Sequence, residues 1–301
     1  MTKPALLICL LPFLWLVSCS EMNPFKDSEI LRIPTDTIIL ANDNVEIACS
    51  TCGSGPLTLV FIHGWCIDQT YWAEQESIFC QNYKTVTLDL PGFGKSGKDR
   101  ALYSIEQYAE DVNTVIKKLN LENVVLIGHS MAGDIILEAK LTNDEVRAIV
   151  GVENFKDINE ELGDEMKADI DQFMILIQEE YSRIAPAYAE ESLLNAQTDS
   201  VVKARVLNDI KSADPHISVS CLQAIFDYNP KKKERLSELD LKLFLINSAK
   251  PETQTRMLDY AGVNYKLLEI SGTGHYPMTE KPRDFNFKLQ EILDELVPKE
   301  E

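Results

Sequence analysis

The order of apolar and polar positions along the chain predicts strands and helices in alternation. Short apolar runs rich in β-branched residues predict buried strands at 57–62, 84–89, 124–127, 146–152, 241–246 and 265–270. Apolar residues at helical spacing predict helices at 70–79, 105–119, 135–139, 251–261 and 282–296. Two further strands, 37–40 and 45–49, flank the turn residues 42–44. This alternation predicts an α/β fold with a mostly parallel central sheet flanked by helices.

The alternation stops between residues 154 and 234, where the chain is acidic and helical in pattern. One helix there carries an apolar stripe of Met166, Ile170, Phe173, Met174 and Ile177. Ligands of such sheets bind at the carboxyl ends of the strands. We therefore expect residues 154–234 to form a helical cap or lid, inserted after the sixth strand, and residues 37–153 and 235–301 to form the core. Some of its large apolar residues could line a substrate pocket, although most should be core: Phe173, Met174, Phe226 and Tyr228.

The first residues have the pattern of an export signal. Lys3 precedes an apolar run from Ala5 to Val17, which is too short to span a bilayer comfortably. We interpret residues 1–18 as a signal peptide and residues 19–36 as a tether. The order Leu-Val-Ser-Cys that ends at Cys19 resembles a bacterial lipobox, which would make Cys19 a lipidated N-terminus. The mature domain would then be membrane-anchored and face the periplasm or the cell exterior; the alternative is an ordinary signal peptide with an incidental cysteine.

Charge and cysteine content exclude some functions. The formal charge of −19 argues against nucleic acid as a partner, because phosphates would be repelled. Of seven cysteines, five remain after Cys9 and Cys19 are set aside, and an odd number does not suit a complete disulfide framework. Cys49 and Cys52 have CxxC spacing, but no second such pair completes a zinc site. We expect them to pack in the core or a turn, with a local disulfide as an alternative.

Polar residues with catalytic chemistry follow several predicted strands directly. These residues are His63, Asp89, Ser130 and Glu153. The strand 124–127 runs through Gly128 and His129 to Ser130, and a helix follows at once. A tight strand-to-helix turn of this kind holds its serine in a strained conformation and exposes the hydroxyl. The pattern indicates a nucleophile at the carboxyl edge of the sheet.

Four segments together resemble the α/β-hydrolase fold over residues 37–296. They are His63-Gly64-Trp65, the segment from Asp89 to Ser96, Gly128-His129-Ser130-Met131-Ala132-Gly133, and Gly274-His275-Tyr276-Pro277. The resemblance implies that Ser130 is the nucleophile and His275 its base, with the amides of Trp65 and Met131 as oxyanion hole. It implies a serine hydrolase, such as a carboxylesterase or lipase, acting on a small-molecule ester or related acyl substrate through an acyl-enzyme. Neither metal-ligand spacing nor a dinucleotide glycine pattern occurs, so no metal or cofactor is expected.

The third member of the triad departs from the common pattern. Many relatives place an aspartate after the strand that follows the lid, where this chain has the residues 247–252 without any aspartate. Glu153, directly after strand 146–152, stands at a position that some family members use, and we prefer it. Glu252 is the alternative, although it could instead start the next helix, where the helix dipole favours an acid. Because the usual acid is missing, a ligand-sensing protein with weak turnover is the second functional hypothesis.

The remaining histidines and Cys66 have other interpretations. His63 precedes Gly64 on the oxyanion loop, His129 lies inside the turn with its side chain directed away from Ser130, and His216 is a surface residue of the lid. Cys66 lacks a helix N-terminus or a recognisable base, which disfavours it as nucleophile. Asp89 is expected to hold the following glycine turn by hydrogen bonds.

Overall fold

The structure is a computed structural model that describes residues 32–156, 163–196 and 198–297. The signal peptide, Cys19 and all but the last residues of the tether that we interpret from the sequence lie outside these residues. The described residues show no helix with the length and apolarity that a membrane crossing requires.

Within the described ranges, eight strands form one sheet, in the order β1-β2-β4-β3-β5-β6-β7-β8. The pairs β1–β2 and β2–β4 are antiparallel, and β3 to β8 pair in parallel fashion with their neighbours. The strands are β1 Thr35–Leu40, β2 Glu46–Cys52, β3 Thr58–Ile62, β4 Lys84–Leu88, β5 Val124–His129, β6 Val146–Val152, β7 Leu243–Ser248 and β8 Tyr265–Ile270. The predicted mostly parallel sheet is confirmed, and β1 takes in Thr35 and Asp36 from the expected tether.

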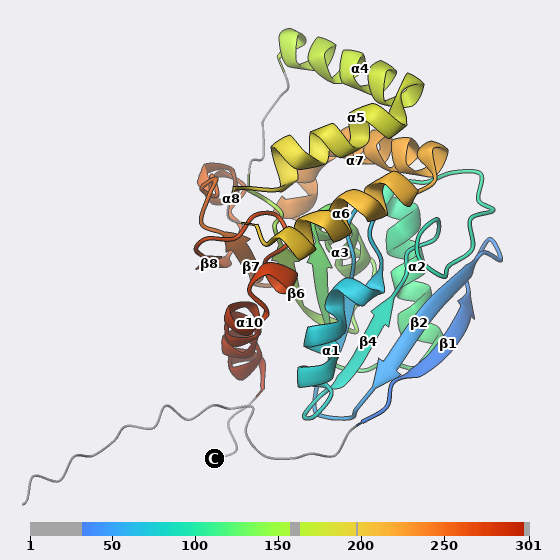
Figure 1. Cartoon of the computed structure of the whole chain (residues 1–301). Coiled ribbons are helices and arrows are strands. Elements are labelled where there is room, and N and C mark those ends of the chain that lie inside the picture. The colour runs from blue at the N-terminus through green and yellow to red at the C-terminus, as the bar shows by residue number, and fades with distance from the viewer. Residues whose placement is uncertain (1–31, 157–162, 197, 298–301) are drawn as a thin grey trace, which may run out of the picture. The chain divides into compact units, whose positions relative to one another are not determined.

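Helices cover both faces of the sheet (Figure 1). Helices α1 and α10 contact each other on one face, and α2 and α3 contact each other on the other. Ser104 caps α2, because its hydroxyl accepts a hydrogen bond from the amide of Gln107. The core helices are η1 Gln69–Trp72, α1 Ala73–Phe79, α2 Ile105–Lys118, α3 Met131–Leu141, α8 Arg256–Tyr260, α9 Pro277–Glu280 and α10 Pro282–Leu296.

The helix predicted for residues 251–261 is wrong over its first half. Only Arg256–Tyr260 is helical. The backbone before it is bonded to neighbouring loops, since Gln254 donates its amide to the carbonyl of Lys156 and Thr253 accepts from the side chain of Asn247. Tertiary hydrogen bonds therefore replace the first helical turn.

Among the described residues, four α-helices and a π-helix lie between β6 and β7, and we call them the cap helices. They are α4 Asp164–Glu179, α5 Tyr181–Tyr188, η2 Ala189–Leu193, α6 Ser200–Ser212 and α7 Pro215–Ser237. Figure 1 shows α5, α6 and α7 together at one end of the sheet, with α4 beyond them. The stripe predicted for α4 is buried at Met174 and Ile177, whereas Met166 is 51% exposed. Tyr228 is core rather than pocket lining, because its buried hydroxyl donates to Glu138 on α3.

A disulfide between Cys49 and Cys52 does not fit the fold. Both residues belong to the strand β2 and are three positions apart, so their side chains point to opposite faces of the sheet. Their Cα atoms are about 10 Å apart along a strand, beyond the roughly 7 Å that a disulfide spans. Both are buried free thiols, so the CxxC spacing here is a packing feature.

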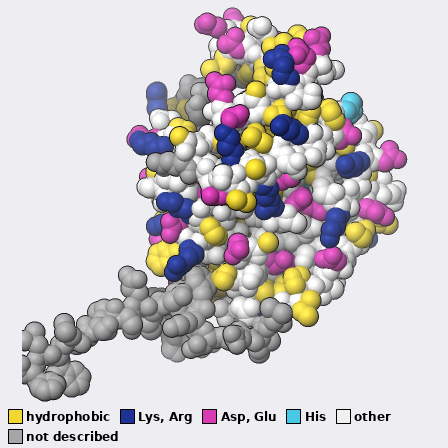
Figure 2. All heavy atoms as spheres, in the orientation of Figure 1, with side chains coloured by type: hydrophobic (Ala, Val, Ile, Leu, Met, Phe, Trp, Pro, Cys, Tyr) yellow, Lys and Arg dark blue, Asp and Glu magenta, His cyan; other side chains and the backbone are white. Residues whose placement is uncertain are grey.

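The surface is polar and mixed in charge. Figure 2 shows Asp and Glu interspersed with Lys and Arg on the face in view. The net negative charge of the sequence is thus not gathered into one acidic patch on that face.

Candidate active site

Ser130 stands alone between β5 and α3, with φ 54° and ψ −120°. A side chain is costly in this region of backbone space, and such strain is found at functional sites. Gly128 makes the turn possible, because a Cβ there would collide with the carbonyl group of Ala132. The strand-turn-helix pattern predicted around Ser130 is thus present, with the strain that presents a serine at the sheet edge.

The strand-to-helix turn at Ser130, which we call the elbow, is held by the end of the neighbouring strand β6. The amide of Ser130 donates to the carbonyl of Val152 at 2.8 Å, and the side-chain amide of Asn154 donates to the carbonyl of Ser130. Gly133 leaves room for Asn154, since a Cβ on Gly133 would overlap its side chain. No sequence motif indicates this role for Asn154.

Glu153 follows β6 directly and also has a positive φ, of 52°. Its Oε2 lies 3.5 Å from Nδ1 of His275, and its Oε1 accepts from the amide of Ser248. Burial opposes ionisation of this carboxyl, but the hydrogen bond from His275 and the charges of His275 and Lys156 hold the pKa of Glu153 below its ordinary value. Glu153 is therefore an ionised acceptor beside the far nitrogen of His275.

Glu252 does not approach His275 and faces solvent. Its side chain is 67% exposed and pairs with Lys250 at 2.5 Å. At the end of β7 the buried Asn247 takes another role: it donates to the carbonyl of Asn154 at 3.1 Å and accepts from the same residue's amide at 3.3 Å. The β7 end, where relatives carry their acid, here secures the loop that carries Glu153.

His275 lies on a loop between β8 and α9 that the cap helices help to hold. Its amide donates to the carbonyl of Leu193, at the end of the π-helix η2, at 3.1 Å. The carboxylate of Glu280 accepts from the amides on either side, those of Gly274 at 3.0 Å and Tyr276 at 3.1 Å, and from the Thr198 hydroxyl at 3.0 Å. The backbone of His275 is thus fixed from both the core and the cap.

His129 contacts the same loop, which the sequence did not indicate. Its Nε2 is 2.6 Å from the carbonyl oxygen of His275, so Nε2 must carry the proton and donate it. Its buried Nδ1 has no hydrogen-bond partner. Burial and the neighbouring His275 lower the pKa of His129 well below its ordinary value. A neutral His129 therefore supports the main chain of His275.

Ser130 and His275 are neighbours, and no direct hydrogen bond joins their side chains among the described residues. The rings of His129 and His275 have centroids 4.8 Å apart, and His129 directly precedes Ser130.

The expected oxyanion donors flank Ser130. Met131 is the first residue of α3, and the N–H groups of the first helical turn have no intrahelical acceptor. On the other side, a Cβ built on Gly64 would lie 3.0 Å from the Cβ of Ser130, so the loop bearing Trp65 approaches closely. The indole of Trp65 is anchored to the cap, since it donates to the carbonyl of Ser218 at 2.8 Å.

Other candidate residues have structural roles. Cys66 is buried, contacts Ser218 and Tyr181, and has a thiol pKa raised by that burial, so it is not a nucleophile. His63 accepts from the amide of Leu90 at 2.9 Å. Asp89 holds its turn as predicted, accepting from the amides of Gln69 and Lys95, both at 2.8 Å. His216 is exposed on α7.

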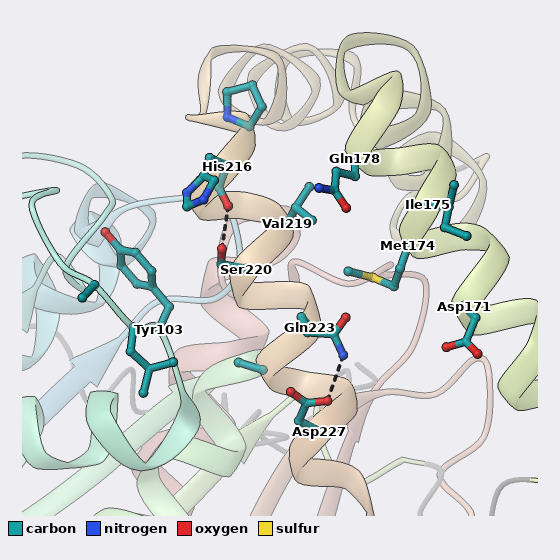
Figure 3. A pocket seen from close by; sticks show the side chains of 14 residues that line it. Tyr103, Asp171, Met174, Ile175, Gln178, His216, Val219, Ser220, Gln223 and Asp227 are labelled. Atoms are coloured by element: carbon teal, nitrogen blue, oxygen red, sulfur yellow. Dashed lines mark hydrogen bonds between the residues drawn. The ribbon is translucent and has the colours of Figure 1, made fainter.

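A groove of about 910 Å³ lies between α4, α7 and the loop at Tyr103 (Figure 3). Figure 3 shows Met174 and Gln178 on α4 facing Val219 and Gln223 on α7. Its lining includes none of Ser130, Glu153 and His275. The groove is therefore a feature of the cap that is separate from the candidate catalytic residues.

The architecture and the serine-bearing elbow define the α/β-hydrolase fold. The family model described as "alpha/beta hydrolase fold" matches residues 58–201, a range that contains Ser130 and Glu153 and ends before His275. The solved structures of a bromoperoxidase and an esterase share this fold.

Three similar proteins carry names that describe different functions. The Karrikin insensitive 2 receptor IA of Petunia hybrida is 22% identical over 249 residues, which cover 78% of this chain and 90% of the receptor. A bromoperoxidase from Bacillus anthracis matches with a TM-score of 0.75 at 19% identity, over 86% of this chain and all of that chain. A thermophilic esterase from Thermogutta terrifontis has a TM-score of 0.75 at 20% identity, over 88% of this chain and all of that chain. At these identities the structural likeness concerns the fold alone.

Proposed function

We propose that the protein is a serine hydrolase that cleaves an ester or related acyl compound through an acyl-enzyme intermediate. The observation that carries the proposal is the contact of the ionised Glu153 with Nδ1 of His275, at the sheet edge that also presents Ser130. A carboxylate at this nitrogen fixes the tautomer that leaves Nε2 free to act as a base.

The proposed reaction has two halves. His275 Nε2 takes the hydroxyl proton of Ser130 as Oγ attacks the acyl carbon, and the amides of Trp65 and Met131 stabilise the oxyanion. His275 then gives its proton to the departing alcohol, which leaves an acyl group on Ser130. A water molecule, deprotonated by the same imidazole, hydrolyses this ester and restores the enzyme. Glu153 stays ionised and stabilises the imidazolium in both halves.

The proposal also gives roles to the cap helices, as a lid, and to the N-terminus, as a lipid anchor. Trp65 and His275 each bond to the cap, through Ser218 and Leu193, which supports a lid over the candidate site. With Cys19 lipidated, the hydrolase would work at the periplasmic or outer face of a bacterial membrane. The esterase from Thermogutta terrifontis, which shares the fold, supports acyl hydrolysis as the reaction class.

The direct test is covalent labelling of Ser130. A fluorophosphonate probe should add one label to the wild-type protein, and peptide mass spectrometry should locate it on Ser130. Ser220→Ala, a change to a half-buried cap residue whose hydroxyl donates to the carbonyl of His216 in its own helix, is the matched control and should label normally. The same protein should hydrolyse p-nitrophenyl esters, and a panel of acyl lengths would define the pocket. Labelling elsewhere, or none, would refute the proposal.

The similarity to the Petunia receptor favours a second candidate, a ligand sensor with slow turnover. In that case the p-nitrophenyl esters would turn over below about 0.1 s⁻¹, roughly a hundredfold under a typical enzyme. Ligands of the sensor would still raise the melting temperature of Ser130→Ala. Fast multiple turnover of a p-nitrophenyl ester would exclude this candidate.

A further inference from the structure

The imidazole of His63 is fully buried beside the loop that carries Trp65, and the proposed reaction assigns it no part. Its Nε2 lies 2.9 Å from the amide nitrogen of Leu90, and its Nδ1 lies 2.8 Å from the carbonyl oxygen of Gly64. A backbone amide can only donate a hydrogen bond, and a carbonyl can only accept one. Nε2 must therefore be unprotonated, and Nδ1 must carry the ring proton.

Burial favours the same neutral ring. It lowers the pKa of His63 below its ordinary value, although the charge of Asp89 acts in the opposite direction. The imidazole thus has one donor and one acceptor, and the main chain uses both of them.

The carbonyl that His63 binds belongs to the same peptide unit as the amide of Trp65. This unit is a trans peptide, whose atoms lie in one plane with the C=O and the N–H pointing in opposite directions. A hydrogen bond that fixes the carbonyl of Gly64 therefore also fixes the direction of the Trp65 N–H. Hydrogen bonds in series polarise one another, so the bond from His63 also makes this N–H a stronger donor.

The glycine at position 64 makes this contact necessary. A Cβ built there would lie 2.7 Å from Nδ1 of His129 and 3.0 Å from the Cβ of Ser130, so no larger residue fits. Glycine allows a wider range of backbone conformations than other residues, which leaves the following peptide free to rotate. The bond from His63 selects one orientation of that peptide.

The cap helices hold the side chains of this loop rather than the peptide itself. The indole of Trp65 donates to the carbonyl of Ser218, and the thiol of Cys66 lies 3.1 Å from the hydroxyl of the same serine. Among the backbone hydrogen bonds of the described residues, none uses the amide of Trp65. A main-chain donor that faces no protein acceptor, beside a nucleophile, is what an oxyanion hole requires.

We propose that His63 is a positioning residue that orients the peptide between Gly64 and Trp65, so that the Trp65 amide donates to the oxyanion formed at Ser130. The inference rests on the proposed function of the Ser130 site. His63 touches no reacting atom and acts through the main chain of the loop. Loss of its donor would let the peptide rotate and would weaken a bond that forms fully only in the transition state.

Two substitutions remove the two bonds of His63 one at a time. In His63→Gln the carboxamide reaches the former place of Nε2, so it can accept from Leu90 but cannot donate to Gly64. In His63→Asn the carboxamide stands near the former place of Nδ1, so it can donate to Gly64 but cannot reach Leu90. Loss of a whole oxyanion donor costs about a hundred- to a thousandfold in kcat, so a misdirected donor in His63→Gln should cost about ten- to a hundredfold. KM should change little, and His63→Asn should keep kcat within about fivefold of wild type.

Stability is the control for these rates. Both variants leave one buried group without its partner, so both should unfold at a lower urea concentration than wild type. Ser96→Ala is the matched control, because its buried hydroxyl accepts from the amide of Ala48 and donates to the carbonyl of Asp89, next to Leu90. It should also be less stable, yet hydrolyse p-nitrophenyl acetate with a kcat near that of wild type. Losses of kcat that follow the urea midpoints across the three variants would overturn the inference.

Nuclear magnetic resonance tests the positioning without any hydrolysis. In the folded wild type, the ring ¹⁵N shifts of His63 should show a protonated Nδ1 and an unprotonated Nε2. The ¹⁵N shift of the Trp65 amide should change in His63→Gln and change much less in His63→Asn. A protonated Nε2 in the wild type would overturn the inference, even if neither variant folds. Absence of fluorophosphonate labelling at Ser130 would refute the proposed function, whereas these shifts would still decide whether His63 holds the peptide.

Discussion

Replacement of Glu153 by glutamine tests the arrangement of the candidate triad most directly. The variant keeps the shape of the side chain and removes its charge. At 3.5 Å from His275 Nδ1, a unit charge pair with an effective dielectric constant of about 20 gains about 5 kcal/mol. Lys156, 3.3 Å from the same oxygen, already offsets part of this field, so about half should remain for the imidazolium formed in the transition state.

A loss of about 2.5 kcal/mol corresponds to a roughly hundredfold fall in kcat, at 1.36 kcal/mol per factor of ten. KM should change little, because the carboxylate acts on His275 and strengthens its contact only as the ring becomes charged. The measurement is the steady-state hydrolysis of a p-nitrophenyl ester at alkaline pH. Glu252→Gln is the matched control and should cost at most a few-fold, since Glu252 pairs with Lys250 in solvent.

Stability must be followed in the same experiment. Loss of one partner leaves Lys156 buried without its counter-charge, which costs about 3–5 kcal/mol for a fully buried pair. Urea unfolding shows whether the variant is folded under assay conditions. A folded Glu153→Gln variant with kcat within threefold of wild type would refute the reasoning, and a larger effect of Glu252→Gln would move the acid to the other loop.

Four other substitutions have defined outcomes. Ser130→Ala and His275→Ala should each lower kcat by about a thousandfold or more, with the double variant little worse, because the groups act as a unit; losses that multiply would contradict this. Gly133→Ala should lower the free energy of unfolding by about 1–3 kcal/mol, seen as a lower urea midpoint, because the new Cβ meets the buried side chain of Asn154. At an open helical site the same substitution would raise the free energy of unfolding. Cys19→Ala should move the protein from the detergent-extracted to the soluble fraction, and unchanged partitioning would exclude the lipid anchor.

Sequence alone predicted the sheet because buried parallel strands are local signals. The runs predicted at 57–62, 124–127 and 146–152 consist mostly of apolar residues, and each one coincides with a strand. The position of Glu153 could be predicted from the strand before it, because the residue that follows a parallel strand lies at the carboxyl edge of the sheet. The structure then brings Glu153, rather than Glu252, to His275.

The supporting contacts could not be predicted, because they join residues far apart in sequence through the main chain. Ser248 gives its amide to Glu153, and Glu280 accepts amides on the loop of His275. Neither residue belongs to a motif, and each would fit an exposed loop equally well. The same limitation explains why the predicted helix start at residue 251 is wrong. Hydrogen bonds from Asn247 to Thr253 and from Gln254 to Lys156 hold the backbone there in a non-helical conformation.

The place of Glu153 in the chain has a consequence for chimeras. Where the acid follows the strand after the lid, as in many members of this fold, an entire strand separates it from the exchanged segment. Here Glu153 is the first residue after β6 and Lys156 follows three positions later, just before the chain leaves for the cap helices. A cap transplanted with its junction at Val152 would bring a foreign acid loop with it. A junction after Lys156, paired with one between Ser237 and Leu243, exchanges the cap and leaves the proton-handling residues native.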